Sequence, residues 1–135
     1  GIRAVGMNVL FDEEVDVHGL QLIGVDYHNA HTTEGFKAIL EKCAIAPNKP
    51  SILLKHEPNH LHVADEAGVS LQISGHTHLG QQWPFGYIAQ LNYLGYAYGL
   101  KQFGTMQMLT SSGIGSWGPP LRVGTNAEAV VITLT

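Results

Sequence analysis

Residues 51–78 read SILLKHEPNHLHVADEAGVSLQISGHTH and decide the fold. Two short apolar runs, at residues 51–54 and 69–74, each predict a buried strand. Residues 60–67 between them predict a short helix that ends at Gly68, since glycine readily adopts the left-handed conformation that closes helices. A strand, helix, strand succession is typical of a crossover between two parallel strands. The stretch therefore predicts an α/β protein with at least one parallel strand pair.

Upstream of this stretch the sequence predicts further strands and one helix. Residues 5–11 and 13–17 alternate loosely between apolar and polar side chains, and residues 20–25 are almost continuously apolar. Thr32 or Thr33 can cap a helix that stops before Pro47. The apolar residues of this helix share one face, which predicts that they enter the core: Phe36, Ile39, Leu40 and Cys43.

Downstream, residues 79–104 predict a long loop, because Gly, Gln and aromatic residues follow one another without a clear period. Residues 105–110 and 128–134 predict two last strands. Aromatic side chains crowd the predicted loop, where they would form either an apolar groove for a lipid-like substrate or, as we expect, a small core beneath the loop: Trp83, Phe85, Tyr87, Tyr93, Tyr96 and Tyr98.

The composition excludes several classes of protein. The 135 residues are 44% hydrophobic, which is enough for one folded domain. The net charge is −4 with only 7 Lys plus Arg, so we expect no nucleic-acid partner. The single cysteine, Cys43, cannot form an internal disulfide. No run approaches the length of a membrane span, so we expect this chain to be soluble, although its compartment stays open.

Three histidines follow the two strands of the central stretch. His56 comes directly after the first strand, and His76 and His78 come directly after the second. Because parallel neighbours deliver their following loops to the same edge of a sheet, we expect the three imidazoles to lie close together. Neutral imidazoles are good ligands for zinc, manganese or iron. The spacing therefore predicts a metal site at this edge.

The motifs Leu53–Pro58 and Leu71–His78 resemble the last two metal-binding motifs of the calcineurin-like metallophosphoesterases. Further elements are similar to the membrane-associated bacterial branch of that family: Gly80-Gln81, Tyr98-Gly99-Leu100, Gly113-Ile114-Gly115-Ser116 and Pro120-Leu121-Arg122. The resemblance covers nearly the whole chain. It implies a fold that is the carboxyl-terminal half of a four-layer αββα sandwich with mixed β-sheets.

The resemblance also implies a reaction and a set of ligands. His56 and His76 would bind the second of two divalent metals (Mn, Zn or Fe) and His78 the first, with a metal-held hydroxide attacking the phosphorus of a phosphoric mono- or diester. No catalytic side chain beyond the metal ligands is expected within this chain. Arg122 and Gln81 are candidates for contacting the substrate, for which the branch suggests a nucleotide-linked lipid or a sugar phosphate.

Three upstream motifs of the family, which supply the bridging carboxylate and the general-acid histidine, have no counterpart here. Asp16-Val17-His18 matches one pattern literally, but it lies in a predicted polar hairpin. We therefore expect residues 1–135 to be the carboxyl-terminal part of one metallophosphoesterase domain whose amino-terminal half is absent, and to be inactive alone. A half sandwich exposes apolar surface, so we expect a homo-oligomer or association with the missing half. By the same resemblance, the full-length protein would be membrane-associated.

Two other functions remain open at this point. Three histidines and one water also satisfy a single tetrahedral zinc, which would give a mononuclear hydrolase or lyase. The second alternative is a binding or scaffold module that uses the aromatic residues and holds no metal. Metal content and phosphodiesterase activity distinguish these alternatives.

Overall fold

The computed structural model describes residues 2–134 and, within them, one six-stranded sheet with the order β1-β2-β3-β4-β6-β5. The central strands β2, β3, β4 and β6 run parallel, and the edge strands β1 and β5 run antiparallel to their neighbours. The mixed α/β class is therefore confirmed. The strands are β1 (Glu13–Val17), β2 (Leu20–Gly24), β3 (Ser51–Leu54), β4 (Leu71–Ser74), β5 (Gly99–Phe103) and β6 (Met106–Thr110).

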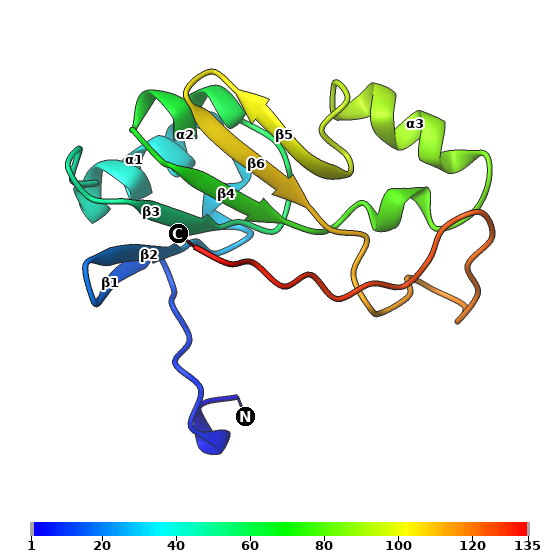
Figure 1. Cartoon of the computed structure of the whole chain (residues 1–135), viewed down its shortest axis with the longest axis horizontal. Helices are drawn as coiled ribbons and strands as arrows, with labels where there is room; N and C mark the ends of the chain where they lie inside the picture. The colour runs from blue at the N-terminus through cyan, green and yellow to red at the C-terminus, as the bar shows by residue number, and fades with distance from the viewer. Residues whose placement is uncertain (1, 135) are drawn as a thin grey trace.

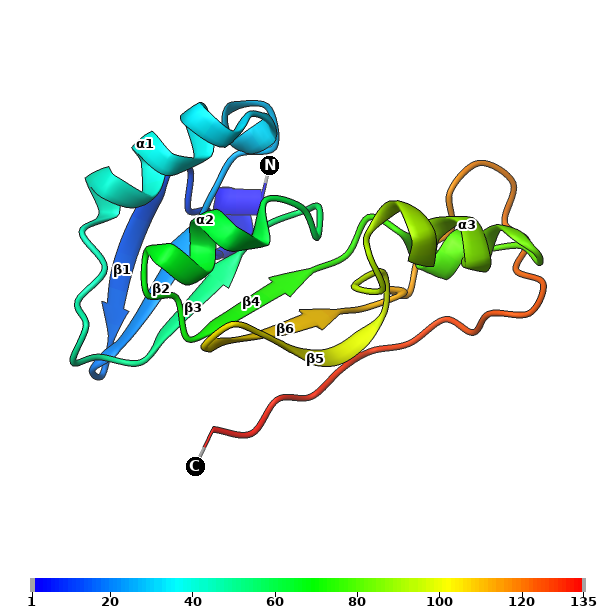
Figure 2. The same cartoon turned by 90° about the horizontal axis from the view of Figure 1, so that it is seen from above.

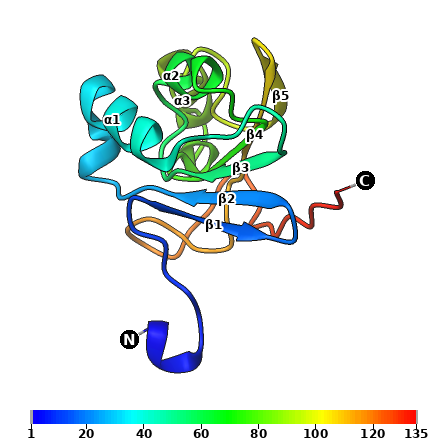
Figure 3. The same cartoon turned by 90° about the vertical axis from the view of Figure 1, so that its left-hand side faces the viewer.

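Helices α1 (Thr33–Cys43) and α2 (Leu61–Glu66) lie together on one face of this sheet (Figures 2 and 3). Helix α3 (Phe85–Asn92) lies away from both, beyond the carboxyl ends of β4 and β6 (Figure 1). The stretch that follows β6 returns along the face opposite to α1 and α2 (Figure 2). Short 3-10 turns occur at Ile2–Val5, Asn29–His31 and His78–Gly80.

The first helix begins and ends as its sequence predicts. The Thr32 hydroxyl accepts a hydrogen bond from the backbone N–H of Gly35, and Glu34 lies in the first turn, where the helix dipole favours an acid. Ala44 ends the helix in the left-handed conformation. The predicted apolar face is buried, including Cys43, which packs as a small apolar residue.

The main core lies between the sheet and the helices α1 and α2. Phe36 of α1 is fully buried against side chains from the central strands, among them Ile23, Leu53 and Met108. These strand residues alternate with others that point to the opposite face, as the two-residue period of a strand requires. The core therefore holds the parallel strands in register and fixes the edge at which they end.

Three expectations about secondary structure are wrong. Residues 5–11 and 128–134 form no strand in the described chain, since Val5 ends a 3-10 turn and the other residues are turn, bend or irregular backbone. Residues 79–104 are not one loop, since they contain α3 and β5. The exposed apolar side chains of α3 obscured its period, because no single face of the helix is buried.

The sheet face opposite the helices carries a row of apolar side chains. The strand register aligns Leu54 with Ile73, Ile73 with Leu109, and Leu109 with Leu100, so the row crosses four strands. The two outer members, Leu54 and Leu100, are 40% and 62% exposed. A contiguous apolar row on a sheet face is typical of a surface that packs against another layer.

Truncation of the core aromatic tests the importance of the helix-covered face. We expect Phe36→Ala to lower the free energy of unfolding by about 3–5 kcal/mol, because it removes a fully buried ring and leaves a cavity. Urea unfolding monitored by circular dichroism measures this change. The same substitution at the exposed Phe11 is the matched control and should change the free energy of unfolding by no more than about 0.5 kcal/mol.

Substitution on the open sheet face tests whether it drives association. We expect the isolated chain to self-associate through this face, and we expect Leu100→Lys to reduce the associated fraction measured by light scattering during size exclusion. Leu94→Lys, at a still more exposed leucine outside the sheet, should leave the associated fraction unchanged. A monomeric wild-type chain at the same concentration would contradict this expectation.

Candidate functional site

The carboxyl ends of β3 and β4 bring the first two candidate histidines together. The parallel hydrogen-bond ladder continues past both strands: the N–H of Lys55 donates to the carbonyl of Ile73 at 3.1 Å, and the N–H of Gly75 donates to the carbonyl of His56 at 3.0 Å. These bonds hold His56 beside the turn that carries His76. The expected placement at one edge of the sheet is thus found for this pair.

The rings of His56 and His76 face each other through their nitrogen atoms. His76 Nδ1 lies 2.9 Å from His56 Nε2, and the ring planes stand at 83°. On the other side of His76, Nε2 lies 3.3 Å from Glu57 Oε1. Because a carboxylate accepts hydrogen bonds, Glu57 favours the tautomer of His76 with the proton on Nε2, which leaves a lone pair on Nδ1. This lone pair points at His56.

Glu57 is itself held in place. Its side chain is only 11% exposed, and its Oε2 accepts a hydrogen bond from Asn59 Nδ2 at 2.6 Å. The nearby Lys55 ammonium donates to the Glu57 carbonyl and to Asn59, and burial lowers the pKa of Lys55 to about 8. Burial, followed by the neighbouring His76, lowers the pKa of His56. A lowered pKa favours the neutral imidazole, which is the form that binds metals.

The turn after β4 is built from unusual backbone conformations. His76, His78 and Leu79 all have positive φ values (66°, 46° and 49°), which cost energy in residues other than glycine. The Thr77 hydroxyl stabilises the turn, because it donates to the carbonyl of Ala97 at 2.7 Å and accepts from the N–H of Leu79. The turn that carries two of the predicted metal ligands is therefore strained, as are several other turns of the described chain.

His78 does not join the pair. Its Nδ1 lies 3.3 Å from a guanidinium nitrogen of Arg122. Within residues 2–134, no group of three or more His, Cys, Asp or Glu side chains is arranged so that it could hold a metal ion. The structure thus brings together two of the three predicted ligands, and it turns the third toward an arginine.

The two candidate substrate contacts, Arg122 and Gln81, bond mainly to their own chain. Arg122 Nη2 donates to the carbonyls of Ser112, Gly113 and Gly115, and Nη1 donates to the carbonyl of Asn126. Gln81 is 3% exposed, and its amide bonds both the N–H and the carbonyl of Trp117. In this arrangement both side chains hold the segment 112–117 beside the site.

A cavity of about 640 Å³ opens next to the histidines. His56, His76 and His78 line one part of it, and α3 lines another. Gly80 is needed here, because a Cβ atom on it would lie 2.3 Å from the backbone of Gly86 at the start of α3. The close approach sets α3 directly against the histidine turn.

The aromatic residues of the stretch 79–104 divide between the two predicted arrangements, a small core and an apolar groove. Tyr96 packs against the main core, as a small core would require. Trp83, Phe85 and Tyr87 are more than half exposed, so they form no core among the described residues. Phe85 and Tyr93 instead line the cavity, which is the groove arrangement.

The remaining polar candidates have structural partners. Asp16 bonds the N–H of Gly19 and pairs with Lys49, so its match to a metal motif is coincidental. The carboxylate of Asp26 accepts the N–H groups of His28 and Asn29, as expected of a structural residue. The ring nitrogens of His60 bond Thr33 and the carbonyl of His31.

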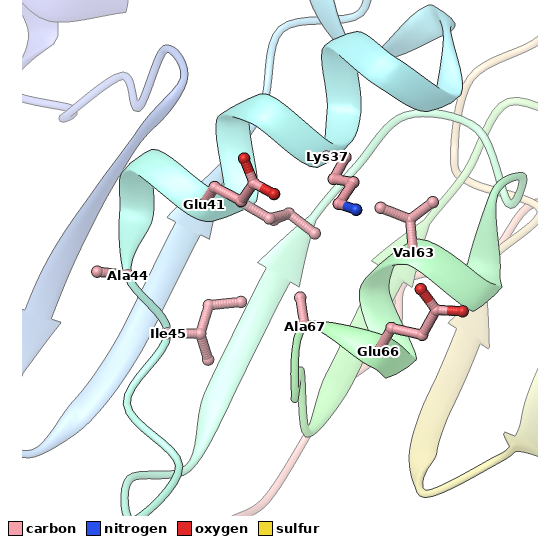
Figure 4. Close-up of a pocket in the computed structure, with 8 residues that line it drawn as sticks. Lys37, Glu41, Ala44, Ile45, Val63, Glu66 and Ala67 are labelled. Atoms are coloured by element: carbon pink, nitrogen blue, oxygen red, sulfur yellow. The ribbon is translucent and has the colours of Figure 1, made fainter.

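A second cavity, of about 350 Å³, opens between α1 and α2 (Figure 4). Its floor is apolar, and charged side chains stand at its rim, among them Lys37, Glu41 and Glu66. It contains no histidine, and none of its residues belongs to the pair at the sheet edge.

Two parts of the site are missing from the predictions made from the sequence. Glu57 has no role among these predictions, although its place directly after His56 and before Pro58 is a signal that a carboxylate accompanies the ligand. The second omission is α3, because the sequence predicted a loop over residues 79–104.

No helix among the described residues is both long and apolar enough to span a bilayer.

Comparison with known proteins gives the family. No family model matches the chain, and no solved structure matches it. The chain is 35% identical over 137 residues to an uncharacterized metallophosphoesterase of Helicobacter pylori, and 40% identical over 144 residues to one of Campylobacter jejuni. It is 33% identical over 138 residues to a bovine transmembrane protein with metallophosphoesterase domain. Each match covers 98% of this chain.

The chain spans only a part of these relatives, namely 37%, 36% and 30% of their respective lengths. The matched region nevertheless includes both histidine motifs, because almost no residue of the chain lies outside it. Together with the mixed sheet and the histidine pair at its edge, these matches show that the chain belongs to the calcineurin-like metallophosphoesterase family.

Proposed function

We propose that this chain contributes His56, His76 and His78 to a two-metal centre that hydrolyses phosphoric mono- or diesters within a longer polypeptide. The observation that carries the proposal is the 2.9 Å approach of His76 Nδ1 to His56 Nε2, with Glu57 behind His76. The relatives' printed names support the class of reaction. A ligating histidine typically donates its other N–H to a carboxylate, as His76 can to Glu57.

The donors present fit part of such a centre. Two facing imidazole nitrogens suit one zinc, manganese or iron ion, whose nitrogen ligands lie about 2.0–2.1 Å from the metal in the case of zinc. His78 would join only after its ring leaves Arg122, which donates to Nδ1. The remaining ligands, including the carboxylates and a general acid, would come from the part of the relatives that this chain does not span. The chain alone is then inactive.

Bound metals would lower the pKa of a shared water and neutralise charge on the phosphoryl oxygens. The residues of this chain would orient the histidine ligands and set their protonation. Glu57 keeps the proton of His76 on Nε2, and burial keeps His56 neutral. Arg122 places a positive charge beside His78, which lines the cavity, and this charge would favour an anionic substrate there.

The proposal extends to the location and the substrate class. The bovine relative is named a transmembrane protein, which supports membrane association of the longer polypeptide. The resemblance to the membrane-associated bacterial branch suggests a nucleotide-linked lipid or a sugar phosphate as substrate. The apolar row on the open sheet face supports packing against the remaining part of that polypeptide. A mononuclear zinc enzyme would need all three histidines around one ion, and the number of bound metals distinguishes it from the two-metal centre.

Replacement of one ligand tests the proposed centre. In a longer polypeptide that carries this chain, we expect two bound metals and hydrolysis of bis-p-nitrophenyl phosphate with manganese. His76→Ala should remove one metal and lower kcat/KM at least about a hundredfold, since loss of a mere supporting residue already costs about 10–100-fold. Metal content by plasma mass spectrometry is the second readout.

His62→Ala is the matched control for this substitution, because His62 is an exposed histidine of α2 that does not line the cavity. It should retain both metals and the activity. A metal-loaded polypeptide without phosphoesterase activity, or a polypeptide that binds no divalent metal, would overturn the proposal.

The carboxylate behind His76 gives an independent prediction. We expect Glu57→Ala to weaken metal affinity about 10–100-fold, because the His76 ring loses the acceptor that fixes its tautomer and orientation. Glu57→Gln keeps an acceptor oxygen and should recover part of that affinity. Competition with a chelator measures the affinity, and thermal unfolding shows whether each variant is folded. Equal metal affinity in all three proteins would exclude a positioning role for Glu57.

A further inference from the structure

The cavity beside the histidines has two chemically different ends. His56, His76 and His78 line one end, and the lining residues further from them are largely apolar. At about 640 Å³, the cavity has the size of a pocket for a small organic molecule. A ligand that filled it would therefore place one part at the imidazoles and another part against apolar side chains.

One face of α3 forms the apolar wall. Phe85, Ile88 and Ala89 lie at positions i, i+3 and i+4 of this helix, so their side chains share a face, and all three line the cavity. Leu91 lies on another face, is 77% exposed and does not line it. Asn92, at position i+7, also lines the cavity, so the helix presents three apolar side chains and one amide to it.

Trp117 forms part of the lining and is held there by a buried amide. Gln81 accepts from the N–H of Trp117 at 2.5 Å and donates to its carbonyl at 2.6 Å. The Gln81 side chain belongs to a residue that is only 3% exposed, so its bonds are shielded from water. These bonds fix the backbone of Trp117, while its side chain lines the cavity and is 74% exposed.

No Asp, Glu, Lys or Arg lines this cavity in the part of the chain that the structure describes. The nearest charged groups lie behind the histidines: Glu57 contacts His76, and Arg122 contacts His78. A charged or strongly polar substituent at the α3 end would lose its water without gaining a charged partner. An apolar substituent would gain from burial at about 25 cal/mol per Å².

From this arrangement we infer that the substrate is a phosphoester whose organic group is apolar and uncharged, with the phosphate at the histidines and the organic group along α3. The inference rests on the proposed function, since it assigns the substrate class of the same site. Of the two classes proposed there it selects the lipid, with the apolar part of the lipid along α3, and excludes the sugar phosphate. It makes Ile88, Phe85 and Trp117 determinants of specificity.

Tryptophan fluorescence tests binding without metal or turnover. The sequence contains two tryptophans, so Trp83→Phe leaves Trp117 as the single emitter. Monomeric octyl phosphate, added below its critical micelle concentration to the 135-residue chain, should shift the Trp117 emission to shorter wavelength and saturate. Glycerol phosphate, AMP and octyl glucoside should bind at least about tenfold more weakly, because each lacks either the apolar group or the phosphate.

Two leucine-sized side chains of α3 provide a matched pair of variants. In the same background, Ile88→Asn should weaken octyl phosphate binding about tenfold, because it places a polar group in the apolar wall. Leu91→Asn makes a similar change three residues away, outside the cavity, and should leave the dissociation constant within about twofold. Equal effects of the two substitutions, equal binding of octyl glucoside and octyl phosphate, or tighter binding of AMP would overturn the inference.

Hydrolysis separates this inference from the proposed function. In the longer polypeptide, kcat/KM should be at least about tenfold higher for p-nitrophenyl octyl phosphate than for p-nitrophenyl methyl phosphate, and Ile88→Asn should reduce that ratio. Hydrolysis of both esters at equal kcat/KM overturns the substrate inference alone. Hydrolysis of neither ester, with saturable octyl phosphate binding at Trp117, overturns the phosphoesterase proposal and supports the ligand preference of the cavity.

Discussion

The parallel pairing of β3 with β4 is the constraint on which the site depends. Its hydrogen-bond ladder runs one residue beyond each strand, through the Lys55 N–H to Ile73 and the Gly75 N–H to His56. Because this backbone pairing is rigid, two histidines that are 20 residues apart in sequence face each other at 2.9 Å. The core formed by Phe36, Leu53 and Met108 supports the same strands from behind. Stability and the geometry of the site therefore rest on the same elements.

Side chains that accompany the histidines determine what the pair can do. The Glu57 carboxylate lies 3.3 Å from His76 Nε2, and Asn59 donates a hydrogen bond to Glu57. On the other side of the turn, Arg122 occupies His78, and Gln81 holds Trp117 in the cavity lining. These contacts make the edge of the sheet into an asymmetric site, in which polar groups meet the imidazoles and apolar groups form the more distant wall.

The sheet is covered unequally. Helices α1 and α2 bury one face, whereas the row from Leu54 to Leu100 crosses four strands on the other. The chain spans 37% of the length of its relative from Helicobacter pylori. A sandwich of two sheets would cover this row and would also bring further ligands to the histidine edge, since both surfaces lie on the same strands.

The sequence by itself determined the local structure and the composition of the site. The apolar runs, the cap at Thr32 and the crossover stretch predicted α1, β3, α2 and β4, and the positions after β3 and β4 predicted where His56 and His76 meet. These features depend on short-range periodicity and on backbone rules that every parallel pair obeys. The same reasoning predicted strands at residues 5–11 and 128–134, which form none in the described chain.

Only the tertiary structure decided the rest. Three features depend on packing that the local pattern does not contain. They are the position of Glu57 beside His76, the direction of His78 toward Arg122, and the place of the apolar α3 residues in a cavity wall. Residue type and spacing specify which groups a chain can offer, but side-chain direction follows from the packing of neighbours that the local pattern does not contain.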